Sequence, residues 1–179
     1  MADEAVVQGV YRALFTPTGE KVYAVIDGAS AENLLDHLYA DRPEWFCLFE
    51  GNLDPDVAEV APYVVELLPG KPFTEWVIRE GWGNHWGVFA VSTQSLRPMR
   101  NHLRSLVKVQ DSQGKVVIFR YYDPRILRVY LPTCNGEETD EFFGPVRFFA
   151  AECADPKVMR MFYPREEGVR EDALDLSKG

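Results

Sequence analysis

The chain has 179 residues, of which 46% are hydrophobic and 13% aromatic, and it carries a formal net charge of −9. This composition is too apolar for an intrinsically disordered protein, and no apolar run approaches the roughly 20 residues that a membrane-spanning helix needs. A net negative charge argues against a general affinity for nucleic acid, which requires a basic surface. Residues 1–4 are acidic and lack the positive start of a secretory signal. We therefore expect a cytoplasmic protein that binds neither nucleic acid nor membrane.

The first quarter of the chain predicts a strand, a helix and a second strand. Residues 22–26 are β-branched or aromatic and end at Asp27-Gly28, which is typical of a strand followed by a turn. Ser30 is a candidate N-cap for a helix with apolar residues at helical spacing between 34 and 39. The apolar run 45–49 suits a strand buried on both faces. The order strand, helix, strand suggests a crossover unit.

The next segment predicts a strand, a helix and another strand. Residues 63–68 have strand character and end at a Pro-Gly turn. Pro72 suits the first turn of a helix, and Gly81 can end that helix in the left-handed conformation. Residues 86–91 predict the following strand. The seven residues that start at Gly81 are therefore a short connection from a helix to a strand.

A basic helix is predicted from Ser95, a candidate N-cap, to about Val107. One stripe of this helix is apolar, and the adjacent stripe carries four bases: Arg97, Arg100, Arg104 and Lys108. The wider segment 97–128 contains eight basic residues against two acidic ones, in a chain that is otherwise acidic. This segment either offsets the acidic first half within the fold or forms a basic patch for an acidic partner segment.

The remaining elements are shorter. Residues 111–114 predict a hairpin-like turn into a strand over 116–122. Asp123-Pro124 has the form of an N-cap followed by the first residue of a helix. A polar loop over 133–140 opens one more short helix, and an apolar stretch covers 146–151.

The charged composition beyond Pro164 predicts a flexible tail over residues 164–179. The sequence shows no internal repeat and no linker in the middle of the chain. We therefore predict a single mixed domain over residues 6–163, of the α/β or α+β class, with a central β-sheet flanked by helices.

Residues with metal or redox chemistry are few and scattered. The three cysteines are odd in number and widely spaced, which favours reduced thiols: Cys47, Cys134 and Cys153. The three histidines are His37, His85 and His102, and no two of the six residues have the short sequence spacing that is typical of a pair of metal ligands. The sequence also lacks a phosphate-binding loop, a nucleophile elbow and a metal-binding helix motif. We expect no metal, no cofactor and no catalytic residue.

The segment from Gly81 to Gly87 combines two tryptophans and a histidine with three glycines. Such a combination indicates either a tightly packed structural corner or a recognition surface. His85 is the best acid–base candidate if the fold brings a carboxylate such as Asp123 beside it. This possibility makes an uncharacterised hydrolase-type enzyme the alternative function. A histidine in a corner is otherwise a structural group whose ring nitrogens are satisfied by hydrogen bonds.

The segment from Tyr121 to Arg125 allows two similar interpretations. Asp123 as a helix cap needs no functional explanation. Arg125 and Arg128 are three residues apart and lie on one helical face, from which they either bind a partner's carboxylates or pair locally.

Short motifs follow one another in a specific order along the chain: Leu48-Phe49-Glu50-Gly51, Ala58-Glu59-Val60-Ala61-Pro62-Tyr63, Pro72-Phe73-Thr74, Gly81-Trp82-Gly83-Asn84-His85-Trp86-Gly87, Leu103-Arg104, Phe119-Arg120-Tyr121-Tyr122-Asp123-Pro124-Arg125, Leu131-Pro132-Thr133 and Phe142-Phe143-Gly144-Pro145. This ordered series resembles the DUF4123 (domain of unknown function) family over about residues 22 to 152.

The resemblance implies a bacterial chaperone or adaptor of the type VI secretion system. Such a protein binds a cognate toxic effector, often through the effector's amino-terminal region, and assists its loading onto the spike protein. The spike itself is an additional candidate partner, and members of the family are not known as enzymes. As a hypothesis, the effector docks on a surface that combines the aromatic corner with the basic stripe, because aromatic and arginine anchors dominate interfaces. The candidate residues are Trp82, His85, Trp86, Arg97, Arg100, Arg104, Tyr122 and Arg125.

Overall fold

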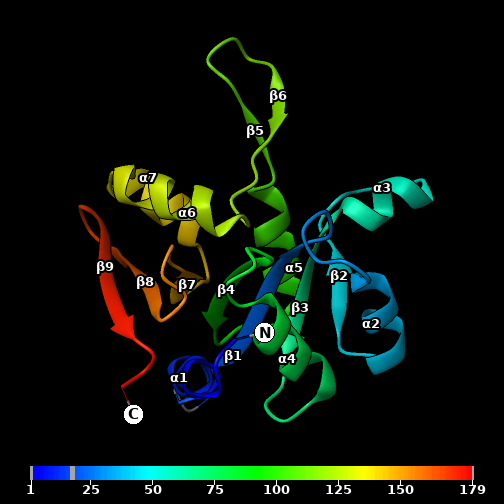
Figure 1. Ribbon diagram of the computed structural model, residues 1–179. Coiled ribbons are helices and arrows are strands. Elements are labelled where there is room, and N and C mark those ends of the chain that lie inside the picture. The colour runs from blue at the N-terminus through cyan, green and yellow to red at the C-terminus, as the bar shows by residue number, and fades with distance from the viewer. Residues whose placement is uncertain (1, 17–18, 179) are drawn as a thin grey trace.

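The computed structural model describes residues 2–16 and 19–178. In this part of the chain, the main sheet has seven antiparallel strands in the order β2-β3-β1-β4-β7-β8-β9, and β5 and β6 form a separate hairpin (Figure 1). The strands are β1 (Lys21–Asp27), β2 (Trp45–Cys47), β3 (Pro62–Leu67), β4 (Gly87–Ser92), β5 (Lys108–Gln110), β6 (Val116–Ile118), β7 (Phe148–Glu152), β8 (Val158–Arg165) and β9 (Gly168–Asp175). The helices are α1 (Glu4–Phe15), α2 (Leu34–Asp41), α3 (Pro55–Val60), α4 (Pro72–Trp76), the π-helical turn η1 (Val77–Gly81), α5 (Leu96–Ser105), α6 (Pro124–Tyr130), the 3-10 turn η2 (Leu131–Thr133) and α7 (Gly136–Phe143).

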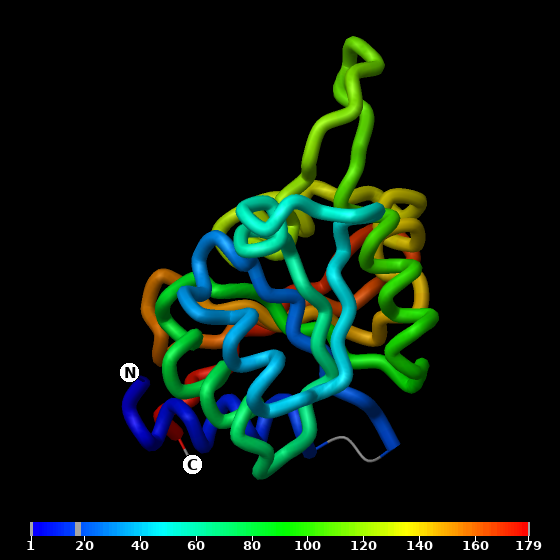
Figure 2. The backbone as a smooth tube through the Cα atoms, turned by 90° about the vertical axis from the view of Figure 1, so that its right-hand side faces the viewer, coloured from blue at the N-terminus to red at the C-terminus, as the bar shows by residue number. Residues whose placement is uncertain are grey.

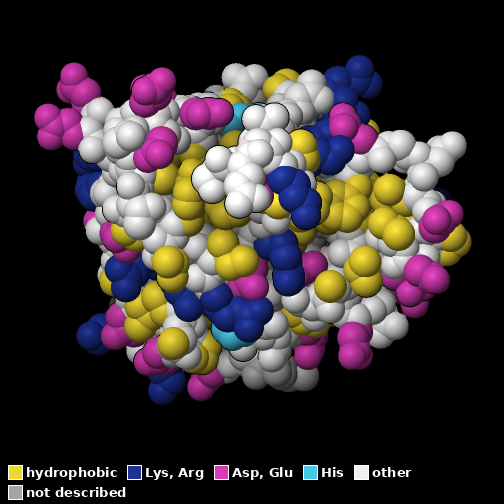
Figure 3. Space-filling view, turned by 90° about the horizontal axis from the view of Figure 1, so that it is seen from above, with side chains coloured by type: hydrophobic (Ala, Val, Ile, Leu, Met, Phe, Trp, Pro, Cys, Tyr) yellow, Lys and Arg dark blue, Asp and Glu magenta, His cyan; other side chains and the backbone are white. Residues whose placement is uncertain are grey.

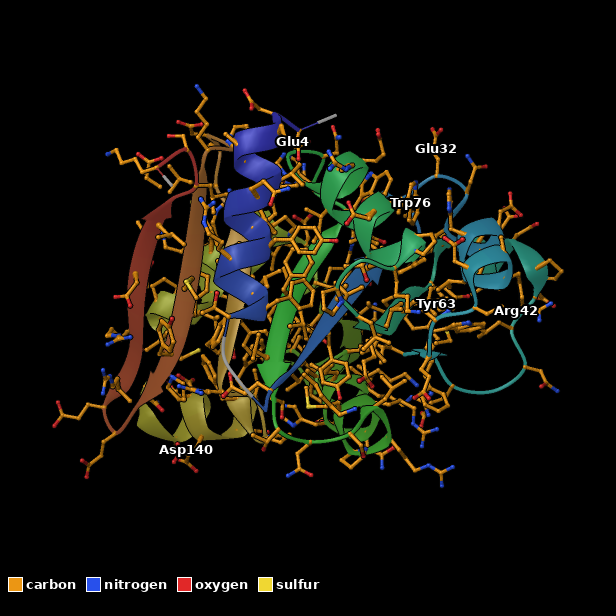
Figure 4. The ribbon with its side chains drawn as sticks, turned by 90° about the horizontal axis from the view of Figure 1, so that it is seen from below. Glu4, Glu32, Arg42, Tyr63, Trp76 and Asp140 are labelled. Carbon is orange, nitrogen blue, oxygen red and sulfur yellow. The ribbon has the colours of Figure 1, made fainter. Side chains whose placement is uncertain are left out.

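Helices cover both faces of the main sheet. Along β1, Val22, Ala24 and Ile26 face one core, whereas Tyr23 and Val25 face the other, because successive side chains of a strand point to opposite faces. Helices α1, α2 and α4 pack on the first core, and α5, α6 and α7 pack on the second. Figure 4 shows α1 and α4 lying across one face of the sheet. This arrangement confirms the predicted mixed domain with a central sheet flanked by helices.

Several predicted elements are confirmed near their predicted positions. The strands predicted over 22–26, 63–68, 86–91 and 146–151 correspond to β1, β3, β4 and β7. The helix predicted after Asp123 is α6, and the Asp123 carboxylate accepts a hydrogen bond from the backbone N–H of Arg125 at 2.9 Å. These segments carry strong apolar patterns or a side-chain cap, which are local signals.

The second strand differs from its prediction. β2 has three residues, which are all half-buried, and it lies at the edge of the sheet, so the prediction of a strand buried on both faces is wrong. β1 and β2 run in the same direction, but β3 lies between them and is antiparallel to both. The crossover unit suggested by the sequence is therefore split by a strand that comes later in the chain.

The start of the second helix also differs. α2 begins at Leu34, after Asn33, which takes the left-handed conformation at φ 61°. Ser30 is not its cap, because the Ser30 hydroxyl donates to Oδ2 of Asp27 at 3.2 Å in the turn after β1. The spacing of apolar residues therefore located the helix but not its first residue.

The prediction of a flexible tail over residues 164–179 is wrong for the residues described. β9 pairs with β8 along its whole length and forms one edge of the main sheet. Leu176 is 1% exposed, and its backbone N–H donates to the carbonyl of Lys157 at 2.8 Å. The charged composition of the segment is compatible with an edge strand, where charged residues discourage pairing with other chains. The sequence also gave no sign that α1 packs beside this segment at Gly9.

Candidate partner-binding surfaces

The aromatic corner, residues 81–87, is a packed turn between a helix and a strand, as predicted. The helix that begins with α4 ends in η1 at Gly81, and β4 begins at Gly87. The left-handed residues are Gly83, at φ 87°, and His85, at φ 60°, so the prediction that Gly81 takes this conformation is wrong. Gly81 is required for a different reason, since a Cβ there would lie 2.8 Å from the indole ring of Trp86.

A buried carboxylate holds this corner. Glu152, the last residue of β7, is 2% exposed, and it accepts the backbone N–H of Gly83 at 2.5 Å and that of His85 at 3.0 Å. Nδ1 of His85 lies against the same carboxylate. The two amide donors stabilise a charge that would otherwise be costly to bury. Glu152 therefore fixes the corner to the end of β7.

The two tryptophans of the corner contribute to the first core. Trp82 is 3% exposed, and its indole N–H donates to the carbonyl of Pro156 at 2.7 Å. Trp86 is half-buried and packs against Trp76, with ring centroids 4.7 Å apart. The space lined by both tryptophans is about 10 Å³, enough for at most one water molecule, although Trp82 also borders an open recess of about 230 Å³. These contacts favour the interpretation of a structural corner over that of a recognition surface.

Tyr122 and Arg125 lie in a charged cluster near the end of β1. Asp27 is buried and pairs with the guanidinium of Arg120. Tyr122 is also buried, and this burial, together with the charge of Asp27, raises the pKa of its phenol to about 12. Burial alone would raise the pKa of Asp123, but the hydrogen bonds from Arg125 outweigh it and hold that pKa below its usual value. Arg125 is therefore paired locally with Asp123, and Tyr122 is buried in the fold, so the structure gives both residues a role within the protein.

The predicted acid–base pair does not form, because His85 contacts Glu152 and Asp123 contacts Arg125. Arg128, from the same helix as Arg125, donates to the backbone carbonyl of Glu152. The aromatic corner and the segment from Tyr121 to Arg128 therefore meet at the end of β7. Glu152 was not predicted as a site residue, because it is a single carboxylate directly after the apolar run 146–151.

The basic stripe of α5 lies beside the edge strand β2. The guanidinium of Arg100 stacks over the ring of Phe46 at 4.7 Å, and Arg104 donates to the carbonyl of Cys47 at 2.7 Å. Arg104 therefore satisfies a carbonyl at the open edge of the sheet. Arg97 is exposed. Within residues 2–16 and 19–178, no carboxylate lies within ion-pairing distance of these three arginines.

The structure separates the aromatic corner from the basic stripe. Trp82 packs in the core on one face of the sheet, and α5 covers the other face. The strand β2, which the stripe contacts, is separated from β4 by β3 and β1, so the two strands lie about 15 Å apart. The single docking surface hypothesised from the sequence is therefore two separate regions.

The hairpin, residues 107–119, projects from the body of the molecule (Figures 1 and 2). Its turn at 111–114 and the start of its second strand were predicted, but its first strand, β5, was not. The helix predicted to reach Val107 ends at Ser105, and the strand predicted over 116–122 ends at Ile118. Four large apolar side chains of the hairpin are exposed by 37%, 57%, 36% and 47%: Val109, Val116, Val117 and Ile118. The alternation of Val107 and Val109 before the turn is the signal that could have identified it.

The two faces of the hairpin differ in their surroundings. Val109 pairs with Val117, and both lie on the face that carries Phe119, whose ring packs 4.8 Å from that of Tyr130. On the other face Val116 and Ile118 pair with Gln110 and Lys108. Figure 3 looks down on this region: basic side chains run through the middle of the surface, and hydrophobic side chains flank them.

The described residues, 2–16 and 19–178, contain few groups suited to metal or thiol chemistry. No group of three or more His, Cys, Asp or Glu side chains in these residues could hold a metal ion. The three cysteines are free thiols, and burial raises the pKa of Cys47 and Cys134. No helix in the described ranges is long and apolar enough to cross a membrane.

Comparison with protein families matches residues 22–141 to the family described as "Domain of unknown function (DUF4123)". The match covers more than half of the chain and includes the aromatic corner, the basic stripe and the hairpin. Neither the curated proteins nor the solved structures gave a match.

Proposed function

The chain belongs to the DUF4123 family, and from this premise we propose that it is a chaperone or adaptor that binds a cognate type VI secretion effector and assists its loading onto the spike protein. In this role the protein acts in the cytoplasm, where it holds the effector before secretion. His85 and Glu152 then serve the fold and not a reaction.

The observation that carries the binding role is the exposed apolar surface of the hairpin. Val116 and Ile118 are about half exposed on an element that projects from the body. Apolar side chains scattered singly are normal on protein surfaces, whereas contiguous exposed patches larger than a few hundred Å² mark interaction sites. The hairpin is convex, whereas sites for small molecules are concave. A protein partner therefore suits this surface better than a small substrate.

The charge distribution supports a partner with an acidic segment. The chain has a net charge of −9, but the segment 97–128, which includes the hairpin, has eight bases against two acids. Arg97, Arg100 and Arg104 have no carboxylate partner among the described residues. Complementary charge increases the rate and the specificity of association.

Co-expression tests the proposal directly. The tagged chain is produced together with the secreted toxin encoded by a neighbouring gene, and complex formation is measured by affinity purification and size-exclusion chromatography. We expect a stable complex with this toxin and none with a toxin from an unrelated secretion system. A neighbouring toxin that remains soluble and separate from the chain would overturn the proposal.

The alternative, an enzyme that uses His85, has its own test. The chain and its His85→Ala variant are assayed against a panel of ester, amide and glycoside substrates. Turnover by the wild-type chain that is lost in a folded His85→Ala variant would favour the enzyme.

A further inference from the structure

We propose that the outer edge of β6 receives an extended apolar segment of the effector, which adds to the hairpin as a third antiparallel or parallel strand. This inference rests on the proposed function, since it specifies where and in which conformation the effector is bound.

The hydrogen bonds of the hairpin show which backbone groups are available. The N–H of Phe119 donates to the carbonyl of Val107 at 2.7 Å, and the N–H of Asp111 donates to that of Lys115 at 2.9 Å. Hydrogen-bonded and non-hydrogen-bonded pairs alternate along an antiparallel ladder, so the backbone groups of Val116 and Ile118 point away from β5. No other strand of the described chain pairs with this side of β6. The edge therefore presents donors and acceptors to an incoming strand.

The side chains distinguish the β6 edge from the opposite edge of the hairpin. The residues of β5 whose backbone groups point outward are Lys108 and Gln110, and lysine on an edge strand discourages pairing. The corresponding residues of β6 are Val116 and Ile118, which are apolar and exposed. Because β-branched residues favour strands, β6 is the better template for a further strand.

The edges of the main sheet are protected in ways that the β6 edge is not. β9 carries Arg170, Glu171 and Asp172 in succession, and charged residues discourage edge pairing. At the other edge, the guanidinium of Arg104 donates a hydrogen bond to the carbonyl of Cys47 in β2. The contrast indicates that the apolar β6 edge is retained for a partner.

A third strand would also complete the hairpin. Two-stranded hairpins are at best marginally stable in water, and three strands with an apolar face are needed for independent stability. A strand beside β6 would cover Val116 and Ile118 on one face and Val117 on the other. Binding would therefore bury apolar surface and satisfy backbone groups at the same time, as in other cases of strand addition.

The charges around the hairpin indicate the chemistry of the incoming segment. Lys115 lies in the turn before β6 and forms no ion pair among the described residues. Arg120, two residues after the strand, is already paired with Asp27, and Lys108 of β5 with Glu50. The wider segment 97–128 has a net charge of +6. The structure thus favours an effector segment with alternating apolar residues and an acidic residue at the end that meets Lys115, because opposite charges across an interface fix orientation.

A pair of proline substitutions tests the edge. Val116→Pro removes an N–H that the hairpin itself does not use, and Gln110→Pro does the same on the opposite edge at the paired position. Both variants are measured by titration against the purified toxin from the co-expression experiment, after circular dichroism confirms that the body is folded. We expect Val116→Pro to weaken binding at least tenfold and Gln110→Pro to change it less than threefold.

Hydrogen exchange of individual amides gives an independent measurement on the wild-type chain. In the free protein the amides of Val116 and Ile118 should exchange rapidly, and in the complex they should become protected, while those of Lys108 and Gln110 remain unprotected. Protection confined to other regions would overturn the assignment of the edge.

The remaining outcomes separate this inference from the proposed function. If the wild-type chain does not bind the toxin, the proposed function fails. If it binds and both proline variants bind equally well, or both lose binding equally, the β6 edge is not the site although the function stands. If Val116→Pro only converts a dimer of the chain to a monomer, the occupant is a second copy and the inference is wrong.

Discussion

The carboxylate of Glu152 and His85 are joined twice, because Glu152 accepts the backbone N–H of His85 at 3.0 Å and also lies against Nδ1 of its ring. The two residues are 67 positions apart in the chain. The contact links the end of β7 to the corner before β4 and gives the histidine a structural role. It also explains how His85, at φ 60°, is held in a conformation that is uncommon for residues other than glycine.

Removing the charge of Glu152 should destabilise the protein. In Glu152→Gln one oxygen becomes an amide group that cannot accept the N–H of Gly83 or His85, and hydrogen bonds to charged groups contribute about 1.5–3 kcal/mol. We expect the free energy of unfolding to fall by about 2 kcal/mol in urea denaturation. The control is Glu50→Gln, whose side chain is 62% exposed, with an expected change within about 0.5 kcal/mol. Equal effects of the two substitutions would contradict the role of Glu152.

Gly9→Ala tests whether the C-terminal segment is docked on α1. A Cβ at Gly9 would lie 2.8 Å from Cβ of Leu176, and still closer to its carbonyl oxygen. Alanine favours a helix by about 1 kcal/mol over glycine, but overpacking costs about 1–3 kcal/mol. We expect a net loss of stability in thermal and urea unfolding, whereas the exposed Gln8→Ala in the same helix should be nearly neutral. A more stable Gly9→Ala variant would show that the C-terminal segment does not dock there.

The stability of the protein should depend on His102 at mildly acidic pH. Burial lowers the pKa of His102, although its hydrogen bond with the carbonyl of Phe142 acts in the opposite direction. The folded state therefore binds this proton less readily than the unfolded state. The contribution of neutral His102 to the free energy of unfolding is therefore fully present above the unfolded pKa of about 6.5. It is lost as the pH falls from there toward the lower pKa of the folded state.

The measurement compares the wild-type chain with His102→Gln by urea denaturation between pH 8 and pH 5. We expect the wild-type protein to lose more stability than the variant over this range, because glutamine does not titrate. Parallel curves would show that His102 does not contribute to the pH dependence.

Arg97→Glu tests the contribution of the basic stripe to binding. Arg97 is exposed, and in the described part of the chain it forms no ion pair, so its replacement should leave stability nearly unchanged. On the proposed function, affinity for the toxin should fall by about threefold to tenfold at low salt and by less at high salt. The matched control is Arg165→Glu, which makes the same charge change on an exposed residue at the end of β8. Equal losses in both variants would indicate an effect of net charge alone.

The sequence by itself determined the elements whose signals are local. β1, β3 and β4 were predictable because their continuous apolar runs are those of strands buried on both faces, and α6 because Asp123-Pro124 forms its own cap. The resemblance to the DUF4123 family was also visible in the sequence, and the family match over residues 22–141 confirms it for every motif but the last, which lies at 142–145.

Only the tertiary structure decided which residues meet. The insertion of β3 between β1 and β2, the pairing of β9 with β8, and the contact of Glu152 with the aromatic corner are all long-range contacts, for which local pattern carries no information. The charged composition of β9 suggested a flexible tail. An edge strand can nevertheless be this polar, because its backbone hydrogen bonds are made by the neighbouring strand and charged side chains are common at sheet edges. The tertiary structure also separated the aromatic corner from the basic stripe. Residues 82 and 97 are close in sequence, but the corner packs on one face of the sheet and α5 packs on the other.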